Sequence, residues 1–412
     1  MRKKSIGDID VEGKRVLVRV DFNVPLDINT GCISDDSRIR ASLLTIEYLV
    51  NHKAKVILCS HLGRPHGKVV EGLRLKPVAE HLSQLINLPV KTVNECIGEK
   101  VENEVKKLKE GEILFLENLR FHPEEETNDP AFAQDLAKLA DIYVNDAFGT
   151  AHRAHASTVG VAKYLPAVAG FLMRKEIQTM EKLLHDPERP FACLIGGAKV
   201  SDKIGLLQNM LRQIDILLIG GGMAATFFKA RDYEVGYSSV EADKLDLAKD
   251  LLDEAQAWKV LLQLPCDVVV AQEIRNGAPN KIVSIKDIPQ DGYIVDIGPK
   301  TIALFRQKLS KCRTIMWNGP MGVYEIPQFS QGTESLAIFI STLNAITIIG
   351  GGSSAEVVQQ MGLAEKMAHV STGGGATLRF LEGIALPGVE VLQNRGKIKT
   401  RRPWHAHPFH RC

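Results

Sequence analysis

With 412 residues, the chain is longer than one hydrophobic core usually supports, so two domains are expected. Its 45% hydrophobic and 24% charged residues are ordinary for a globular protein and do not suggest disorder over long spans. It holds no apolar run of membrane-spanning length, no secretory signal is apparent, and its seven cysteines include no CxxC pair typical of zinc or redox sites. We therefore expect a cytoplasmic protein with free thiols.

Basic residues gather near the C-terminus. The net charge is +2, but Arg395 to Cys412 contains six basic residues and no acid, which leaves −4 for the rest of the chain. We expect residues 393–412 to form a disordered basic tail. Its arginines, lysines and Trp404 would permit contact with nucleic acid or another anion, and its histidines would permit a weak metal site.

Short apolar runs in the first half predict strands, and each run is followed by a polar loop. The runs are Arg15 to Val20, Val56 to Cys59, Ile113 to Leu116 and Ile142 to Val144. Segments with helical periodicity, such as SRIRASLLTIEYLV and KPVAEHLSQLI, lie between them. This alternation predicts right-handed crossovers and a parallel sheet.

The loops after these runs carry the candidate binding residues. Asp21 and Asn23 lie just past the end of the first run. The cationic candidates are Arg38, His61, Arg64, Arg120 and Arg153. Ligands bind beyond the carboxyl ends of parallel strands, so these residues would form one pocket for a small ligand with phosphate or carboxylate groups. Each arginine alone could equally be a solvated charge, and recurrence at successive strand ends is what favours a site.

Near the midpoint, the segment IGGAKVSDK follows the apolar run Phe191 to Ile195 and leads into a helical pattern. Gly196 and Gly197 permit a tight turn, and a helix start offers unpaired N–H groups, which together outline a phosphate site. Lys199 and Lys203 would reach the same anion if the helix begins early. The alternative is a solvated first turn.

In the second half the predicted strands end in glycines and few arginines. The strands are Asp215 to Ile219, Asp267 to Ala271, Tyr293 to Asp296, Thr314 to Trp317, Ala345 to Ile349 and His369 to Thr372. Glycine turns follow five of them, at one edge of an expected single sheet. Such turns let backbone amides approach a polyphosphate, although they could also only permit tight connections. A GxxxxGK(S/T) loop is absent, and loose GxGxx(G/A) matches at Gly220 and Gly350 lack the acid that ribose recognition prefers.

These patterns predict an α/β fold with two doubly wound, Rossmann-like parallel-sheet domains joined by a helical hinge. The expected limits are 1–165 for an acid-binding domain, 166–185 for the hinge, 186–375 for a nucleotide-binding domain and 376–392 for a returning segment. Tyr164 to Leu184 is the expected connecting helix. A cationic half facing a glycine-rich half implies transfer between their ligands, with domain closure to exclude water.

Ten segments, in this order, resemble phosphoglycerate kinase from about Ile6 to about Leu392. They are RVLVRVDFNVP, SHLGRP, LENLRFHPEE, NDAFGTAHRAHAST, GGAKVSDK, IGGGMAATF, DIGPKT, WNGPMGVYE, GGGSSAEVV and VSTGGGATLRFLEG. The resemblance implies the glycolytic transfer of a phosphoryl group between 1,3-bisphosphoglycerate and ADP, giving 3-phosphoglycerate and ATP with magnesium. It also implies a cytoplasmic monomer.

The resemblance implies roles for individual residues as well. The acid-substrate site would comprise Asp21, Asn23, Arg38, His61, Arg64, Arg120 and Arg153. The nucleotide site would comprise Lys199, Lys203, Asn318, Glu325, Gly351, Gly352, Ser353 and Ser354. Arg38 and Lys199 would flank the transferring group, Lys203 would hold nucleotide phosphates, and Glu325 would lie toward the ribose. No protein metal ligand is assigned.

The chain departs from the family pattern at one loop. The family commonly has GGGD at the last nucleotide loop, where the Asp is associated with the metal, and Ser353 stands there in this chain. A neutral hydroxyl is a poorer partner for magnesium than a carboxylate, so we expect weakened magnesium dependence and a retained activity.

Two other functions compete with this one. An oxidoreductase of the NAD type is opposed by the missing ribose acid and by the lysines of GGAKVSDK. A binding protein without activity, recruited to nucleic acid by its tail, would show salt-sensitive binding that disappears when Arg395 to Cys412 is deleted.

Overall fold

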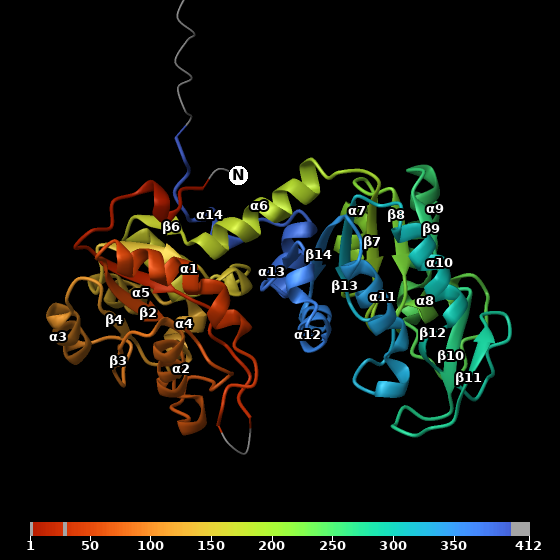
Figure 1. Cartoon of the computed structure of the whole chain (residues 1–412), viewed down its shortest axis with the longest axis horizontal. Coiled ribbons are helices and arrows are strands. Elements are labelled where there is room, and N and C mark those ends of the chain that lie inside the picture. The colour runs from red at the N-terminus through yellow and green to blue at the C-terminus, as the bar shows by residue number, and fades with distance from the viewer. Residues whose placement is uncertain (1–2, 28–30, 397–412) are drawn as a thin grey trace, which may run out of the picture.

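The computed structural model describes residues 3–27 and 31–396. The chain forms two lobes, each built around a six-stranded parallel sheet, and one long helix runs between them (Figure 1). This confirms the predicted fold class. Of the predicted tail, residues 397–412 lie outside the described residues. Residues 393–396 are described and differ from the prediction of disorder, because Gln393 N donates to Ala167 O at 2.9 Å and Arg395 pairs with Asp8.

The sheet of the first lobe has the strand order β3-β4-β2-β1-β5-β6, and every neighbouring pair is parallel. Its strands are β1 (Arg15–Arg19), β2 (Lys55–Cys59), β3 (Val90–Thr92), β4 (Ile113–Phe115), β5 (Ile142–Asn145) and β6 (Ala167–Ala169). Its helices are α1 (Ser37–Asn51), α2 (Lys76–Ile86), α3 (Glu99–Lys107), α4 (Pro123–Thr127) and α5 (Pro130–Lys138). The predicted apolar runs form the middle of this sheet.

Strand β1 shows why these runs are continuous rather than alternating. Val16 and Val18 are buried in one core, and Leu17 is buried in another on the opposite face of the sheet. A strand that is covered on both faces needs apolar residues at every position. Arg19 ends this strand and is only 1% exposed, although an arginine is rarely buried without a partner for its charge.

The main sheet of the second lobe has the order β15-β14-β13-β7-β8-β9, again with parallel pairs throughout. Its strands are β7 (Phe191–Ile195), β8 (Ile216–Ile219), β9 (Leu261–Gln263), β13 (Thr314–Asn318), β14 (Ile346–Gly350) and β15 (His369–Val370). The helices of this half are α7 (Ile204–Met210), α8 (Ala224–Ala230), α9 (Leu245–Ala257), α10 (Pro299–Leu309), α11 (Gln331–Ser341), α12 (Gly352–Gln360) and α13 (Gly375–Leu381).

Two predicted strands do not belong to this main sheet, which corrects the expectation of a single sheet. β10 (Asp267–Ala271) pairs antiparallel with both β11 (Asn280–Ser284) and β12 (Tyr293–Ile297) in a separate small sheet. An apolar run predicts a strand but carries no information about its partner. The glycine turn after β12, at Gly298, therefore does not lie at the edge of the main sheet with the other glycine turns.

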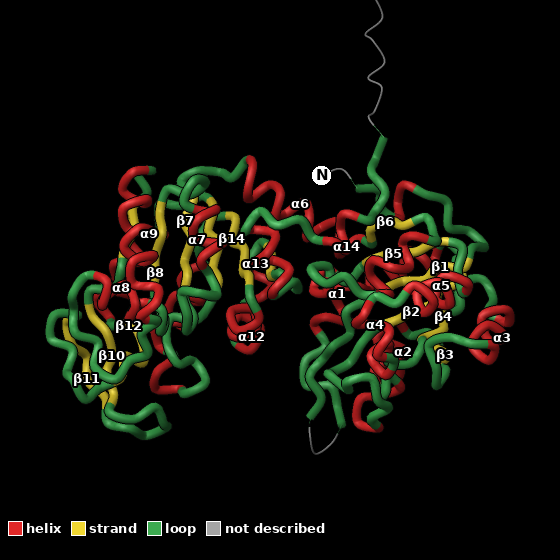
Figure 2. The backbone as a smooth tube through the Cα atoms, turned by 180° about the vertical axis from the view of Figure 1, so that it is seen from behind, coloured by secondary structure: helices red, strands yellow, loops and turns green. Residues whose placement is uncertain are grey.

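The connecting helix begins later than predicted. α6 (Phe171–His185) follows Gly170, because the residues before it form β6 and pair with β5. Its apolar side places Met173, Ile177 and Met180 in a core cluster that contains residues of both main sheets. α6 therefore joins the two cores (Figures 1 and 2).

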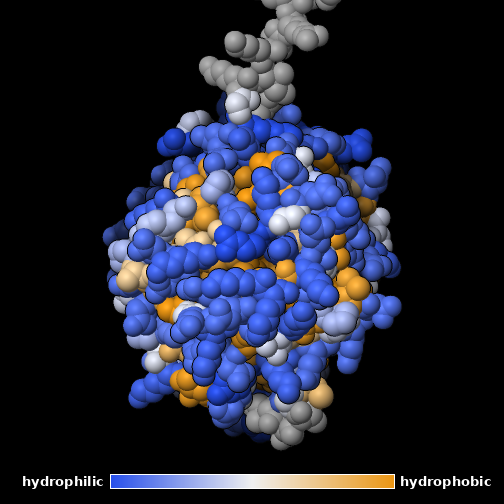
Figure 3. Space-filling model, turned by 90° about the vertical axis from the view of Figure 1, so that its left-hand side faces the viewer, coloured by the Kyte–Doolittle hydropathy of each residue, from blue (hydrophilic) through white to orange (hydrophobic). Residues whose placement is uncertain are grey.

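The last described segment returns to the first lobe. α14 (Pro387–Glu390) lies beside β6 (Figure 2), and Gly388 N donates to Ala151 O at 2.9 Å. Asn145 Nδ2 in turn donates to Gly388 O at 3.0 Å. The outer face of the first lobe is mostly hydrophilic, with hydrophobic residues in small separate patches, as is usual for a surface in water (Figure 3). The numerical domain limits given above stay a prediction.

Candidate active site

Loops at the carboxyl ends of the two main sheets line one cleft, with a volume of about 710 Å³. The first lobe contributes Asn23 and Arg38, and the second contributes Gly352 at the start of α12 and Ser371 after β15. α12 and α13 lie on the side of the second lobe that faces the first (Figure 1). Loops from both predicted halves of the site therefore line the same space.

Three predicted residues meet at the wall of the first lobe. The carboxylate of Asp21 is buried, and its Oδ2 accepts from Arg38 Nη1 at 3.2 Å. Its Oδ1 lies 3.7 Å from His61 Nδ1. Arg38 comes from the first turn of α1 and stays 37% exposed, so its remaining donors are available to a ligand in the cleft.

Arg19 fixes the protonation state of His61. Its Nη2 lies 3.2 Å from His61 Nδ1, and because a guanidinium only donates, this ring nitrogen accepts. The neutral imidazole then carries its proton on Nε2. Burial, followed by the charges of nearby arginines, holds the pKa of His61 well below its ordinary value. His61 is thus a neutral hydrogen-bond donor.

A buried carboxylate compensates the charge of Arg19. Arg19 Nε donates to Ser157 Oγ at 2.8 Å, and Ser157 Oγ donates to Glu125 Oε1 at 2.6 Å. The Ser157 backbone N–H donates to Glu125 Oε2 at 2.9 Å. Both charged side chains are essentially inaccessible to solvent, so this chain of contacts forms a rigid support under the pocket.

Hydrogen bonds also tie together the loops that follow three strands. Asn23 Oδ1 accepts from Gly63 N at 2.8 Å, and Gly63 O accepts from Arg120 Nη1 at 2.9 Å. Arg120 Nε also pairs with Glu126 at 3.1 Å. Asn23 and Arg120 therefore shape the loops in addition to any contact with a ligand.

The last two cationic candidates are less restrained. Arg64 is exposed and directly follows Gly63, whose backbone is hydrogen-bonded to Asn23 and to Arg120. Arg153 is half-buried, and its Nε donates to His152 Nε2 at 3.3 Å. Arg64 and Arg153 are thus free to adjust their positions to a bound anion.

On the second lobe, residues 196–203, called the lysine loop below, differ from the expected turn into a helix. α7 begins at Ile204, so Lys199 and Lys203 precede it and are not neighbours on a helical face. In the turn before the helix, the N–H groups of Val200 and Ser201 are already paired, since Glu241 accepts from Val200 N at 2.5 Å and from Ser201 N at 3.1 Å.

The two lysines lie in different environments. Lys199 is exposed, whereas Lys203 is half-buried. Burial lowers the pKa of Lys203 to about 8, against the opposing effect of Asp202 and Glu382.

The loops after β13 and β14 approach each other closely. Both amide atoms of Asn318 are buried and have no hydrogen-bond partner among the described residues, which leaves them available to a ligand. Gly351 has a φ of 90°, and a side chain there would bring its Cβ to 2.9 Å from Asn318 Nδ2, so only glycine fits. Ser354 is buried and its Oγ accepts from Gly319 N at 2.6 Å, which assigns it to holding this loop. Gly352 has open space around it.

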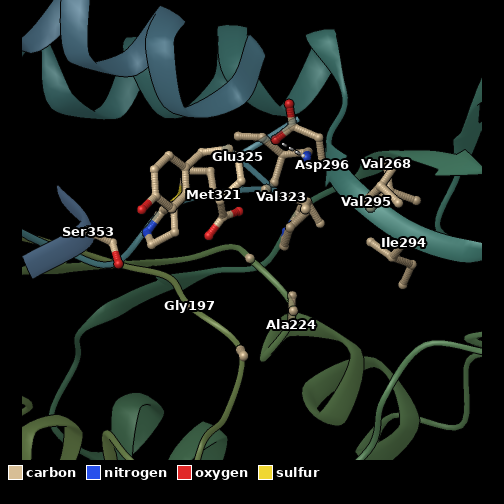
Figure 4. Close-up of a pocket in the computed structure, with 18 residues that line it drawn as sticks. Gly197, Ala224, Val268, Ile294, Val295, Asp296, Met321, Val323, Glu325 and Ser353 are labelled. Atoms are coloured by element: carbon tan, nitrogen blue, oxygen red, sulfur yellow. Dashed lines mark hydrogen bonds between the residues drawn. The ribbon is translucent and has the colours of Figure 1, made fainter. Parts of the chain in front are cut away.

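A mostly apolar cleft of about 300 Å³ adjoins these loops (Figure 4). In this view Ser353 lies at one end and Ile294 at the other, with Gly197 below and Glu325 above. A narrow apolar slot with a carboxylate at its rim suits a flat base and a sugar. Ser353 also shares a hydrogen bond with Tyr324.

Sequence reasoning missed two groups of residues here. Arg19 could have been found, because an arginine inside the apolar run RVLVRV contradicts the pattern of a buried strand. Val268, Ile294 and Val295 line the apolar cleft from the small sheet, and no sequence signal places that sheet beside the main one.

Comparison with known proteins agrees with this geometry. The family model described as phosphoglycerate kinase matches residues 6–384. The chain belongs to the phosphoglycerate kinase family. A phosphoglycerate kinase of Dictyoglomus turgidum is 57% identical over 399 residues, covering 96% of this chain and 100% of that protein. One of Moorella thermoacetica is 55% identical over 395 residues, with coverage of 96% and 100%.

Solved structures of the phosphoglycerate kinase family share the fold. The structure from Coxiella burnetii superposes with a TM-score of 0.84 at 40% identity, covering 94% of this chain and 98% of that one. The structure from Pyrococcus horikoshii has a TM-score of 0.83 at 34% identity, with the same coverage. These matches extend over both lobes.

A magnesium ion would find little protein coordination in this site. Among residues 3–27 and 31–396 there is no cluster of three or more histidine, cysteine or acidic side chains that could hold a metal. Ser353 and the amide oxygen of Asn318 are neutral donors. This donor set fits a cation that arrives with nucleotide phosphates and does not fit a separate protein cage. The same residues contain no helix that could cross a membrane.

Proposed function

We propose that this chain catalyses the reversible transfer of a phosphoryl group between 1,3-bisphosphoglycerate and ADP, giving 3-phosphoglycerate and ATP. The observation that carries the proposal is the cleft of about 710 Å³, because Arg38 and Asn23 line it from one lobe and the start of α12 lines it from the other. Arg38, the cation in the lining of this cleft, suits the carboxylate of the glycerate, and the glycine loops beside the apolar cleft suit the nucleotide.

On the first lobe, Arg64, Arg120 and Arg153 would grip the distant phosphate of the glycerate. Asp21, Asn23 and His61 would orient its hydroxyl and carboxyl groups, with His61 as a neutral donor. Fixing the glycerate in this way places its reacting carboxylate toward the second lobe.

On the second lobe, Lys203 would hold nucleotide phosphates, and Asn318 with Gly351 and Gly352 would meet the phosphates through amide groups. Glu325 would accept from the ribose, and Ser353 would lie near the phosphates. Ser354 supports the loop, because its hydroxyl accepts from Gly319 N inside the fold.

The chemical step needs charge stabilisation more than proton transfer. An acyl phosphate leaves a carboxylate of low basicity, so no strong general base is required. Arg38 and Lys199 would flank the phosphoryl group from the two lobes and stabilise its charge during transfer. Magnesium bound with the nucleotide would supply further shielding of phosphate charge. Closure of the lobes would exclude water.

The proposal is tested by the rate at which the protein phosphorylates 3-phosphoglycerate with ATP, followed through reduction of the acyl phosphate product. We expect turnover that requires both substrates and magnesium. A folded protein without turnover at any magnesium concentration would refute the proposal. The binding-protein alternative would then return. It depends on Arg395 to Cys412, of which residues 397–412 lie outside the described part of the chain. A cytoplasmic, monomeric enzyme is part of the same proposal.

A further inference from the structure

Glu241, far from the lysine loop in the sequence, holds that loop in place. It lies between α8 and α9, and its Oε2 accepts from Val200 N at 2.5 Å and from Ser201 N at 3.1 Å. Its Oε1 accepts from the hydroxyl of Ser201. One carboxylate therefore satisfies three donors of the turn that separates Lys199 from Lys203.

Glu241 is itself anchored to the second lobe. Its backbone N–H donates to Thr226 Oγ1 at 3.3 Å, and Thr226 is buried in α8. Its carbonyl oxygen accepts from Lys244 N at 2.9 Å. Burial raises the pKa of Glu241, but hydrogen bonds from Ser201 and Val200 outweigh it and leave the pKa below its ordinary value. The group is thus a carboxylate at neutral pH.

The lysine loop has few other restraints in this region. At one end Gly197 N donates to Pro320 O at 2.9 Å, and at the other Lys203 N donates to Val200 O at 2.8 Å. Between them the side chain of Val200 is buried, while Lys199 and Ser201 are exposed. Release of the Glu241 contact would therefore let the backbone next to Lys199 move.

The contact also decides which groups meet the nucleotide. The N–H groups of Val200 and Ser201 already bind an anion of the protein itself, so they do not form a phosphate cradle. The lysine side chains then supply the positive charge of this loop, and their position determines its effect. A displacement of about 1 Å at a reacting group is enough to cost about 100-fold in rate.

We propose that Glu241 is a positioning residue, which fixes the turn at Val200 and Ser201 and thereby the positions of Lys199 and Lys203 on either side of it. This inference rests on the proposed function, because those lysines matter only if phosphoryl transfer occurs there. It predicts that loss of the carboxylate slows the chemical step without weakening glycerate binding.

A first experiment is independent of activity. Amide hydrogen exchange is measured for the peptide covering residues 195–205 in the full-length protein and in Glu241→Ala. We expect exchange at Val200 and Ser201 to become at least about tenfold faster, since both N–H groups lose their acceptor. Asp243→Ala is the matched control, because that exposed carboxylate forms an ion pair with the neighbouring Lys244 and does not contact the lysine loop in the described part of the chain. Unchanged exchange in Glu241→Ala would overturn the inference.

A second experiment measures kcat and KM in the same proteins. For Glu241→Ala we expect kcat to fall by about 10- to 100-fold with an unchanged KM for 3-phosphoglycerate, while Asp243→Ala matches the wild type. Glu241→Gln keeps one acceptor oxygen, so its kcat should lie between those of Glu241→Ala and the wild type. Wild-type kcat in both Glu241 variants would refute the positioning role.

The two proposals fail in different ways. If the wild-type protein shows no turnover, the proposed function is refuted, and the exchange experiment still tests the contact. If the wild type is active, the Glu241 variants decide the positioning role alone. Should Glu241→Ala fail to fold in a thermal melt, Glu241→Gln decides it, with reduced kcat at constant KM in support and wild-type kcat against.

Discussion

The residues of the site fall into two groups. Some can contact a ligand, and others hold those ligand-contacting residues in position. Arg38 is partly exposed and bound to the buried Asp21, whereas Arg19 and Glu125 are inaccessible and stabilise the pocket from below. The exposed candidates could be predicted, because their charges follow apolar runs. Glu125 could not, since PEEET shows three adjacent glutamates and only packing selects the middle one for burial.

Arg38→Ala should lower kcat by about 100- to 1000-fold and leave the Kd for 3-phosphoglycerate within a few-fold of the wild-type value. The reason is that Arg38 would act mainly on the transferring group, while Arg64, Arg120 and Arg153 would bind the glycerate phosphate. Steady-state kinetics and calorimetric titration measure the two quantities. Arg40→Ala, in the same helix and paired with Asp36, is the control. An equal loss of turnover and affinity would contradict the assigned role.

Nucleotide affinity should weaken as the pH rises from 7 to 9. Burial lowers the pKa of Lys203 to about 8, so the free protein loses this charge in that range. We expect the Kd for ADP, from direct titration, to increase several-fold. Lys203→Arg keeps its charge and should flatten the profile. Parallel profiles in the two proteins would show that another group is responsible.

Ser353→Asp should lower the magnesium concentration needed for half-maximal turnover, because a carboxylate attracts a hard cation better than a hydroxyl does. Kinetics across a magnesium titration give this concentration for the wild type and the variant. Gln307→Glu adds a similar charge at an exposed position of α10, outside the lining of either cleft, and controls for a general electrostatic effect. An ordinary magnesium requirement in the wild type, unchanged in Ser353→Asp, would argue against our expectation.

At the scale of elements, the strands missed by sequence reasoning lie at the edges of sheets. β3, β6 and β9 are edge strands of three residues, and β11 is a largely exposed edge of the small sheet. Edge strands need no continuous apolar run, because one side has no neighbouring strand. β6 was missed for another reason. Its residues Ala167–Ala169 are apolar and all buried, but three residues are too few to distinguish a strand from the start of a helix, so the predicted helix included them.

The start of α6 is held by a buried carboxylate. Asp146 Oδ1 accepts from Met173 N at 3.2 Å, and Gly170 passes so close that a Cβ there would overlap Asp146. Burial raises the pKa of Asp146 to about 7, and hydrogen bonds from Thr45 and Met173 only partly oppose this. Asp146 therefore couples the anchoring of the hinge helix to pH.

Wild-type stability should fall relative to Asp146→Asn as the pH rises from about 4 to 7. The folded state holds this proton more tightly than the unfolded state, so ionisation costs the folded state up to about 4 kcal/mol above pH 7 and nothing below both pKa values. Urea unfolding of both proteins across this range measures the difference. Asp246→Asn, at an exposed position of α9, is the control. A difference that stays constant with pH would contradict a raised pKa at Asp146.

At the scale of the whole molecule, the two lobes carry different chemistry and share one cleft. Each half of the sequence predicted its own sheet and its own kind of strand end. The sequence could not predict that the small sheet lines the apolar cleft of about 300 Å³, because that depends on contacts between segments that are distant in sequence. The central claim is that the first lobe binds the glycerate and the second binds the nucleotide.

The most direct test is calorimetric titration of 3-phosphoglycerate and of ADP into Arg64→Ala and Lys203→Met. Arg64 is exposed, and methionine keeps the apolar stem of Lys203, so both changes remove charge with little effect on packing. We predict that Arg64→Ala loses at least about tenfold in affinity for the glycerate only, and that Lys203→Met loses a similar factor for the nucleotide only. If either variant loses both ligands alike, or neither loses any, the division of binding between the lobes is wrong.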